Sequence, residues 1–532
     1  MNAGMIRGAC PTLSAPMATG DGLLIRLVPA RGGFTPPQLV GLAEAAFRYG
    51  NSILEVTARG SLQIRGLEDH TVLPLAAEID ALGIVVRTGV PVETGPLAGL
   101  DPSETADPRP LADTIRSALE ATDLPERLGP KVSVVVDGGG RLHLDGIIAD
   151  VRLTATGCGR NIAWNLAIGG TAETAMPIAS LHEEKAGKAA VLVLAAIAEI
   201  GRQGRARDLD PQLIRTLIND ASPEDNGSFP PGRAEGDPRC KPTSTPEEGR
   251  AIAYGILPPP LTPPDKGEGN TGAALPSETI DVLAPSGAAT ESPSPLWGGV
   301  RGGCEIPVSG EIERGSEAKG SSAQPIGIFD LSDGTAALGV GLPFGQIEAS
   351  RLAGFCRLAE DHGVTEVRLA PGRAILMLAE PSACLDLQNV APRYALIVDP
   401  ADARLGIAAC PGSPACASGH IAARSLAEQL AALGNGLFDQ SLTVHVSGCA
   451  KGCACPGASD LTFVGNPESI DLVVGGRASG LADVRLPHGE IRHGFARLGG
   501  LYRQARRRGE SVNSCFSRLG ALRVAATFQG QS

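Results

Sequence analysis

The chain has few aromatic residues, little positive charge and no long apolar run. Aromatic side chains make up 3% of the 532 residues, and acidic residues outnumber basic ones to give a net charge of −12. Nucleic-acid binding draws on basic surfaces and aromatic stacking, so this composition argues against a nucleic-acid partner. The longest apolar run, residues 189–198, is half of the roughly 20 residues that a membrane span needs and is typical of a buried helix.

The first 16 residues lack the apolar core of a secretion signal. The twelve cysteines are too few for a disulfide scaffold in a chain of this length, and thiols that hold metal belong in a reducing compartment. We therefore expect a cytoplasmic protein without a membrane anchor. Single hydrophobic cores stop growing near roughly 250–300 residues, so we also expect several domains.

Four cysteines in the last third of the chain form two pairs. Cys410 and Cys416 have five residues between them, and Cys449 and Cys453 have three. Glycine and proline crowd both pairs, which suits loops that wrap closely around a group and direct backbone amides at sulfur. Four thiolates on two such loops indicate a [4Fe–4S] cluster. Structural zinc, which more often uses shorter gaps within each pair, and unrelated buried thiols are the alternatives.

The two halves of the chain share an order of predicted elements. Strand, helix and strand are predicted in the first half at 21–28, 35–49 and 53–56, and in the second half at 333–342, 346–362 and 366–369. Between the two cysteine pairs we predict a helix at about 421–433 and a strand at about 442–446. A strand at 131–136 with the glycine turn 138–140 after it resembles this later strand and the glycine-rich cysteine loop that follows it. The pattern indicates a duplicated unit in which only one copy carries metal.

Residues 207–324 differ in composition from both halves. They are rich in Pro, Gly, Ser and Glu and bury too little apolar surface to offset the entropy of ordering. We predict a disordered linker or insertion, whose effect on activity stays open. Cys240 and Cys304 lie within it and are weak ligand candidates.

Several motifs carry a family resemblance. The TxRxxxQ stretch that begins at Thr57, the duplicated halves and the C-x5-C…C-x3-C array together resemble the sulfite/nitrite reductase superfamily. Within it, the segments RGACPTL (7–13), GPLAGLDPSE (95–104) and SGCAKGCACPG (447–457) resemble the precorrin-3B synthase family. The resemblance implies an α+β fold with duplicated ferredoxin-like units and two reductase-like α/β units. A pseudo-twofold would relate the copies, and one α/β unit would carry a [4Fe–4S] cluster.

The resemblance also implies five segments in chain order. They are a ferredoxin-like half at 10–100, an α/β domain without a cluster at 110–206, the linker at 207–324, a second ferredoxin-like half at 325–398 and the cluster-binding domain at 399–520.

The implied activity is that of an oxygen-dependent oxidoreductase of the monooxygenase type. It would convert precorrin-3A into precorrin-3B, by ring hydroxylation and lactone formation, in aerobic cobalamin biosynthesis. O₂ would be a co-substrate, and a mononuclear non-haem iron is implied, with unknown ligands. NADH would supply the electrons through a partner reductase, because the chain has no convincing Rossmann fingerprint.

Candidate substrate contacts lie near the TxRxxxQ stretch. Thr57, Arg59, Gln63 and Arg65 would face one side of an extended segment. Arginine grips carboxylates through two parallel hydrogen bonds, so this row suits the acid side chains of a tetrapyrrole. Lys131, at the start of a predicted strand, could add a charge contact. A solvated edge strand is the alternative interpretation of the row.

Other residues stay open. Arg368 and Arg373 could act similarly in the second copy, and no catalytic residue is predicted. His445 and His420 are possible iron ligands, whereas His182 is typical of a helix surface. The roles of Cys10 and Cys455 are unassigned.

Two other functions remain possible. A sirohaem-dependent sulfite or nitrite reductase would use the same cluster. Where that family has paired lysines, however, this chain has Lys131 and Ser133, so one positive charge is missing. A non-catalytic electron carrier or sensor would not need such a large basic-lined scaffold.

Overall fold

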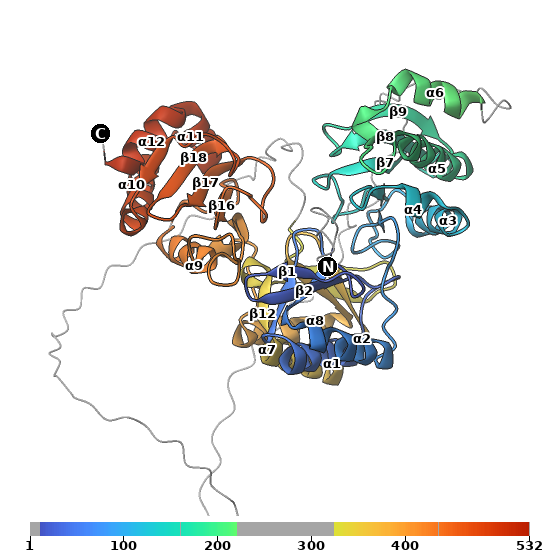
Figure 1. Cartoon of the computed structure of the whole chain (residues 1–532), viewed down its shortest axis with the longest axis horizontal. Helices are drawn as coiled ribbons and strands as arrows, with labels where there is room; N and C mark the ends of the chain where they lie inside the picture. The colour runs from blue at the N-terminus through green and yellow to red at the C-terminus, as the bar shows by residue number, and fades with distance from the viewer. Residues whose placement is uncertain (1–10, 160, 221–323, 435, 531–532) are drawn as a thin grey trace, which may run out of the picture. The chain divides into compact units, whose positions relative to one another are not determined.

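The computed structural model describes residues 11–159, 161–220, 324–434 and 436–530, which form four β-sheets with flanking helices (Figure 1). Cys10, Cys240, Cys304 and most of the predicted linker lie outside the described residues.

The first sheet and its helices come from the N-terminal part of the chain. Its elements are β1 (Met17–Thr19), β2 (Gly22–Leu27), α1 (Pro36–Tyr49), β3 (Ile53–Val56), β4 (Leu62–Leu67) and α2 (Asp69–Ala81). Helix α1 confirms the prediction for 35–49. Thr35 accepts from the Gln38 amide while the Gln38 side chain accepts from the Thr35 amide, a capping box that fixes the helix start.

The second sheet repeats the first. Its strands are β10 (Gly327–Asp330), β11 (Ala336–Gly341), β13 (Glu366–Ala370) and β14 (Ala374–Ala379), and its helices are α7 (Ala349–Asp361) and α8 (Pro381–Val390), with short 3₁₀ turns at Pro343–Gly345 and Ala391–Tyr394. The short strand β12 (Gln346–Glu348) precedes α7 in the chain. Strands run antiparallel in the order β1-β2-β4-β3 in one sheet and β10-β11-β14-β13 in the other. The matching order agrees with the duplication predicted from the sequence.

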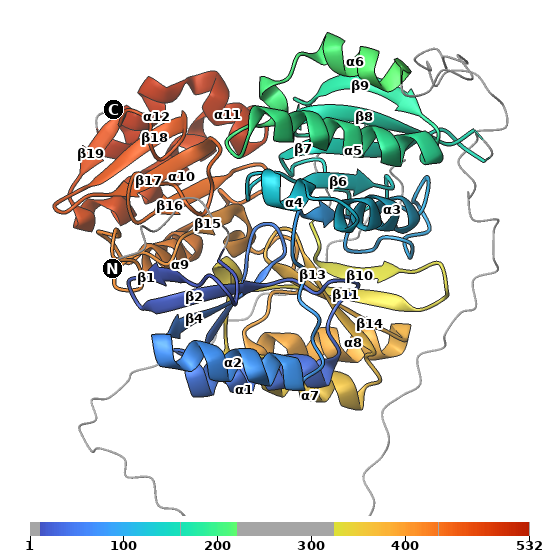
Figure 2. The same cartoon turned by 45° about the vertical axis from the view of Figure 1, so that its right-hand side comes forward.

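The two sheets exchange backbone pairing. Strand β12 pairs with β3 of the first sheet, so Ile347 lies opposite Leu54. In return, Phe34, just before α1, forms a β-bridge with Val367 of β13. Helix α1 packs against α7, and one hydrophobic core contains side chains from both copies (Figure 2). Residues 346–348, predicted as the start of a helix, are therefore a strand that completes the neighbouring sheet.

The third and fourth sheets also match each other. The third contains β5 (Val92–Glu93), β6 (Val134–Asp137), β7 (Ala149–Thr156), β8 (Ala163–Gly170) and β9 (Met176–Leu181). The fourth contains β15 (Ile407–Ala409), β16 (Val444–Ser447), β17 (Ser459–Gly465), β18 (Ile470–Gly476) and β19 (Val484–Leu486). In each sheet the first three strands are parallel and the last two pair antiparallel.

Helices cover both of these sheets. With the third sheet belong α3 (Arg109–Glu120), α4 (Leu124–Arg127), α5 (Glu183–Ile200), a 3₁₀ turn (Ala206–Asp208) and α6 (Pro211–Asp220). With the fourth belong 3₁₀ turns at Ala403–Gly406 and His488–Glu490, α9 (Ala423–Leu433), α10 (Ile491–Ala505), α11 (Val512–Leu519) and α12 (Ala521–Gln529). Residues 189–198 lie in α5, a largely buried helix as predicted.

Two more predicted boundaries need correction. Residues 211–220, which composition assigned to the linker, form α6, and its Ile214 and Ile218 are buried in the core of the third sheet. These two apolar side chains lie four residues apart on one face of α6 and pack it onto the core. The strand predicted at 131–136 begins only at Val134, so Lys131 lies in the preceding turn.

Candidate functional site

Both cysteine loops leave the same edge of the fourth sheet. Cys410 directly follows β15, and Cys449 comes two residues after β16. These two strands are parallel neighbours, so their carboxyl ends meet at one edge. This edge is where open α/β sheets generally bind ligands. We define the first cysteine loop as residues 410–416 and the second as 449–453.

The four thiols lie within electrostatic reach of one another. The Gly448 amide donates to Cys410 Sγ at 3.1 Å. Burial, with the neighbouring charges of Cys416 and Cys449, raises the pKa of Cys410. Burial and the charges of the other three thiols likewise raise the pKa of Cys453. Such mutual repulsion between thiolates is relieved when they share a positively charged metal group.

Glycines allow the loops to touch. A Cβ on Gly412 would lie 2.4 Å from the Ile421 carbonyl oxygen, and Gly412 has a φ of +67°. A Cβ on Gly448 would lie 3.0 Å from Gly412 Cα and 3.5 Å from Cys410 Sγ. A side chain at Gly412 would therefore push the first loop away from residues 421–423, and one at Gly448 would push against the first loop.

The donor set fits an iron–sulfur cluster. A [4Fe–4S] cluster takes its four thiolates on separate irons, so its ligands need not converge on one point, and amide hydrogen bonds to sulfur tune it. Four thiols on two closely packed loops, with one amide already directed at sulfur, meet these requirements.

No ligand set for a mononuclear iron is apparent. The part of the chain that the structure describes contains no group of three or more His, Cys, Asp or Glu residues that could hold a single metal ion. His445, in β16, is fully buried, and neither ring nitrogen has a hydrogen-bond partner among the described residues. Burial, with the charge of Arg373, lowers the pKa of His445 to about 4, so its ring is neutral at physiological pH. His420 is exposed, beside the first cysteine loop.

Cys455 remains outside the thiol group defined above. Its Sγ lies 3.5 Å from Ser459 Oγ, and it lines a cavity of 230 Å³ together with Arg373.

The third sheet has carboxylates where the fourth has cysteines. The glycine turn after β6 is contacted by the 95–104 segment: a Cβ on Gly140 would lie 2.8 Å from Asp101 Oδ2 and 2.9 Å from Glu104 Cγ. Glu104 Oε2 accepts from the Gly99 amide at 2.7 Å. Burial, reinforced by Asp107 and Asp101, raises the pKa of Glu104 to about 7. The GPLAGLDPSE motif thus fills the sheet edge that carries no cysteines.

The structure does not bring the predicted substrate residues together. Thr57 and Arg59 lie in the turn between β3 and β4, where Thr57 Oγ1 accepts from the Ser61 amide and Arg59 donates to the Ile148 carbonyl at 2.8 Å. Lys131 is exposed, in the turn before β6 of a different sheet.

Gln63 and Arg65, by contrast, lie within β4 and are nearly buried, at 7% and 5% exposure. With its amide oriented to satisfy both ends, Gln63 bridges Arg26 and Glu55 on the neighbouring strands. Arg65 forms two hydrogen bonds to Asp21, at 2.8 and 3.1 Å, and lies 3.7 Å from Glu55. The polar groups of these two side chains are therefore occupied by contacts within the protein and do not form a row open to substrate.

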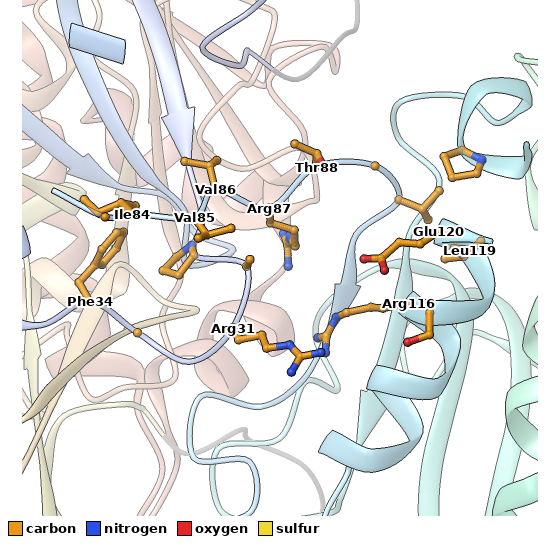
Figure 3. A pocket seen from close by; sticks show the side chains of 18 of the residues that line it. Arg31, Phe34, Ile84, Val85, Val86, Arg87, Thr88, Arg116, Leu119 and Glu120 are labelled. Atoms are coloured by element: carbon orange, nitrogen blue, oxygen red, sulfur yellow. The ribbon is translucent and has the colours of Figure 1, made fainter. Parts of the chain in front are cut away.

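Sequence reasoning missed a groove lined by arginines. Two cavities, of 680 and 370 Å³, share Arg31, Arg87 and Arg116, whose side chains come from different segments toward the same space (Figure 3). Arg87 pairs with Glu93 at 3.3 Å and Arg116 with Asp113 at 2.8 Å. Arg31 reaches Asp113 only at 3.9 Å, and its side chain is 77% exposed.

The smaller cavity adds three further arginines, Arg59, Arg109 and Arg368. Arg109 pairs with Asp107 and Arg368 with Glu366, whereas Arg59 donates to a backbone carbonyl. We call the two cavities together the arginine-lined groove. Two of its members, Arg59 and Arg368, are candidate carboxylate contacts from the sequence, but no sequence signal joins them to Arg31, Arg87 and Arg116.

Comparison with known proteins decides the family. The chain is 37% identical to a precorrin-3B synthase from Sinorhizobium over 528 residues, which cover 99% of this chain and 95% of that protein. The chain belongs to the precorrin-3B synthase family. Residues 15–82 also match the nitrite/sulfite reductase ferredoxin-like half domain. The resemblance drawn from the sequence motifs is confirmed.

More distant relatives agree with this assignment. The chloroplastic ferredoxin–nitrite reductase of Zea mays is 27% identical over 177 residues, 29% of this chain and 30% of that protein. The structure of the NirA protein of Mycobacterium tuberculosis covers 94% of this chain and 84% of its own, with a TM-score of 0.63 at 17% identity. A synthase of this family therefore has the fold of NirA. No helix among the described residues is long and apolar enough to cross a membrane.

Proposed function

We propose that this chain converts precorrin-3A into precorrin-3B in cobalamin biosynthesis, by hydroxylating a ring carbon and closing a lactone from a neighbouring acetate. The observation that carries the proposal is the 37% identity to a precorrin-3B synthase over nearly the whole chain. One atom of O₂ enters the substrate and the other leaves as water, and two electrons from NADH balance the reaction. We expect the reaction to take place in the cytoplasm.

We further propose a [4Fe–4S] cluster on the two cysteine loops, held by Cys410, Cys416, Cys449 and Cys453. When bound, the cluster supplies one-electron transfer. The Gly448 amide stabilises negative charge on the Cys410 sulfur, and the loop glycines let the backbone approach closely. Electrons would arrive from NADH through a partner reductase. The proposal contains no step through a mononuclear iron, because the described residues offer no ligand set for one.

The repeated sheets support a division of labour between copies. We propose that 399–520 is the cluster domain, that 110–206 is its counterpart without a cluster, and that 10–100 and 325–398 are ferredoxin-like halves related by a pseudo-twofold. The matching strand orders and the reciprocal exchange of β12 and Phe34 support this division.

The arginine-lined groove is our candidate for the substrate's acid side chains. Arg31 and Arg59 have the least neutralised guanidinium groups in it, since no carboxylate of the described residues lies within 3.5 Å of either. Arginine binds carboxylates through paired hydrogen bonds, and the apolar side chains of Phe34, Ile84 and Val86 supply a surface for a macrocycle. Arg59 links the TxRxxxQ turn to this groove.

Anaerobic purification followed by iron and sulfide analysis tests the cluster, and incubation with precorrin-3A in air tests the reaction. We expect about four iron and four sulfide per chain and a broad absorption that dithionite bleaches. We expect the hydroxylactone to form only with O₂ and an electron donor. Cys416→Ser should lose the sulfide, whereas Cys515→Ala, which alters a buried thiol elsewhere in the same domain, should keep it.

A sirohaem-dependent sulfite or nitrite reductase is the second candidate, because NirA and the maize reductase resemble the chain. Sirohaem bands, with reduction of sulfite or nitrite and no conversion of precorrin-3A, would favour it over the synthase.

A further inference from the structure

Two arginines, one from each ferredoxin-like copy, donate to backbone carbonyls at the ends of the two cysteine loops. Arg65 of β4 donates from Nη2 to the Ala415 carbonyl at 3.0 Å. Arg373, in the turn between β13 and β14, donates from Nη2 to the Ala454 carbonyl at 3.0 Å. Ala415 immediately precedes Cys416, and Ala454 immediately follows Cys453. Each accepting carbonyl therefore belongs to the neighbour of a proposed cluster ligand.

Arg65 is fixed in place by surrounding charges. Although burial opposes ionisation, the negative charges of Glu55 and Asp21 raise the pKa of Arg65, so its guanidinium stays charged. Glu55 is held in turn by Arg424 of α9 at 2.5 Å. The chain thus keeps a buried cation beside the first cysteine loop and anchors it on two carboxylates.

The β1–β2 turn supports the same loop. A Cβ on Gly20 would lie 2.4 Å from the Ala417 nitrogen and 2.9 Å from Cys416 Cα. The turn that precedes Asp21, the partner of Arg65, is therefore in direct contact with the backbone of Cys416. The backbone contact from Gly20 and the hydrogen bond from Arg65 therefore restrain the same short stretch at the end of the first loop, residues 415–417.

Arg373 occupies a conformation that favours glycine. Its φ is +66°, a region that costs a residue with a side chain about 1–3 kcal/mol. Its aliphatic stem packs closely on Gly345, where a Cβ would lie 3.1 Å from Arg373 Cδ. Burial and the charge of Arg424 lower the pKa of Arg373, and the charge of Cys455 opposes this shift. The strained backbone at Arg373 holds its guanidinium at the end of the second cysteine loop, which favours a functional role for this hydrogen bond.

We propose that Arg65 and Arg373 are positioning residues that hold the two cysteine loops and place positive charge beside the cluster. The inference rests on the cluster proposed above. Net charge and hydrogen bonding set a cluster's reduction potential, and nearby positive charge favours the reduced cluster. Arg373 donates to a carbonyl and therefore raises the potential, whereas Asp21 and Glu55 balance the charge of Arg65, which acts mainly by holding the first loop. By restraining the loops they also slow the loss of iron.

The test compares three variants of the full chain with the parent. Arg373→Gln removes a charged guanidinium whose N–H donates a hydrogen bond to the Ala454 carbonyl, so it leaves no carboxylate unpaired. Arg65→Lys keeps the charge but loses the paired geometry to Asp21. Arg152→Gln is the matched control: Arg152 is 2% exposed and also donates to backbone carbonyls, but in the sheet without cysteine loops.

The readouts are iron and sulfide per chain, the cluster's reduction potential by electron paramagnetic resonance titration, and its rate of loss in air. We expect Arg373→Gln to shift the potential to more negative values and to lose the cluster about 10-fold faster, as for other outer ligand contacts. Arg65→Lys should speed the loss with a smaller shift in potential. Arg152→Gln should change neither quantity.

Three outcomes would overturn the inference. Parental potentials and loss rates in both the Arg65 and Arg373 variants would show that these contacts do not act on the cluster. An equal effect of Arg152→Gln would show a general loss of stability. A parent chain that takes up no sulfide would remove the cluster itself and with it this inference, an outcome visible before any variant is made.

Discussion

Gly412→Ala places a methyl group where the first cysteine loop has no space. The new Cβ would lie 2.4 Å from the Ile421 carbonyl oxygen and 2.5 Å from the Ala423 nitrogen, both backbone atoms that cannot rotate away. The φ of +67° adds a second cost, because residues with a Cβ avoid this region. Both costs fall on the loop between Cys410 and Cys416.

The two costs can be separated. The left-handed conformation costs about 1–2 kcal/mol for a residue with a side chain. Overpacking typically adds about 1–3 kcal/mol. Gly475→Ala is the matched control, since Gly475 has a φ of +63° and a Cβ added there would meet no atom within 4 Å. The excess for Gly412 is therefore the steric part, about 1–3 kcal/mol, or roughly 5–150-fold in the local opening equilibrium.

The assay is cluster loss in air, followed by absorption, together with urea unfolding of each variant. We expect Gly412→Ala to lose the cluster roughly 5–150-fold faster than Gly475→Ala, by the same conversion of about 1–3 kcal/mol. Equal loss rates in the two variants would refute the reasoning. They would mean either that the loop relaxes freely around the added methyl group or that it does not hold the cluster.

Three further changes have defined outcomes. Burial raises the pKa of Glu104 from 4.5 to about 7, so the folded chain binds this proton more tightly than the unfolded chain does. The folded state therefore loses stability as pH rises from 4.5 to about 7, and Glu104→Gln should make the melting temperature less dependent on pH in this range. Burial lowers the pKa of His445 from 6.5 to about 4, so stability falls as pH falls through that window, and His445→Leu should remove this component of the same melting curve. Arg31→Glu should raise KM for the tetrapyrrole roughly tenfold or more through charge reversal in the groove, with iron content unchanged. Arg48→Glu, on the exposed face of α1, should leave KM at the parental value.

Local signals were sufficient for the elements that depend on neighbours in sequence. The start of α1 follows from Thr35 and Gln38, three residues apart, which satisfy each other's backbone amides. The cysteine loops could be anticipated because glycine and proline crowd both cysteine pairs and an apolar strand is predicted just before Cys449. The repeat was visible because each copy preserves its own order of strand, helix and strand.

Pairing across long sequence separations was not predictable in the same way. Residues 346–348 adjoin a helix, and their own sequence pattern does not show that they pair with β3 at 53–56. They form a strand because β3 would otherwise be an open edge of the first sheet. The arginine-lined groove was missed for the same reason, since Arg31, Arg87 and Arg116 come from three separate segments. Each of these arginines alone has the pattern of a solvated side chain.

Only part of the TxRxxxQ row lies in a strand, so the prediction that its side chains share one face holds only for that part. Alternation places residues on one face only within a strand, and β4 begins at Leu62. Arg59 therefore belongs to the turn and lines the groove, whereas Arg65 belongs to the strand and reaches a carbonyl 350 residues away. One short motif thus connects the proposed substrate groove with the first cysteine loop. Because the turn and the strand are continuous, a shift of β4 by one residue would displace both contacts at once.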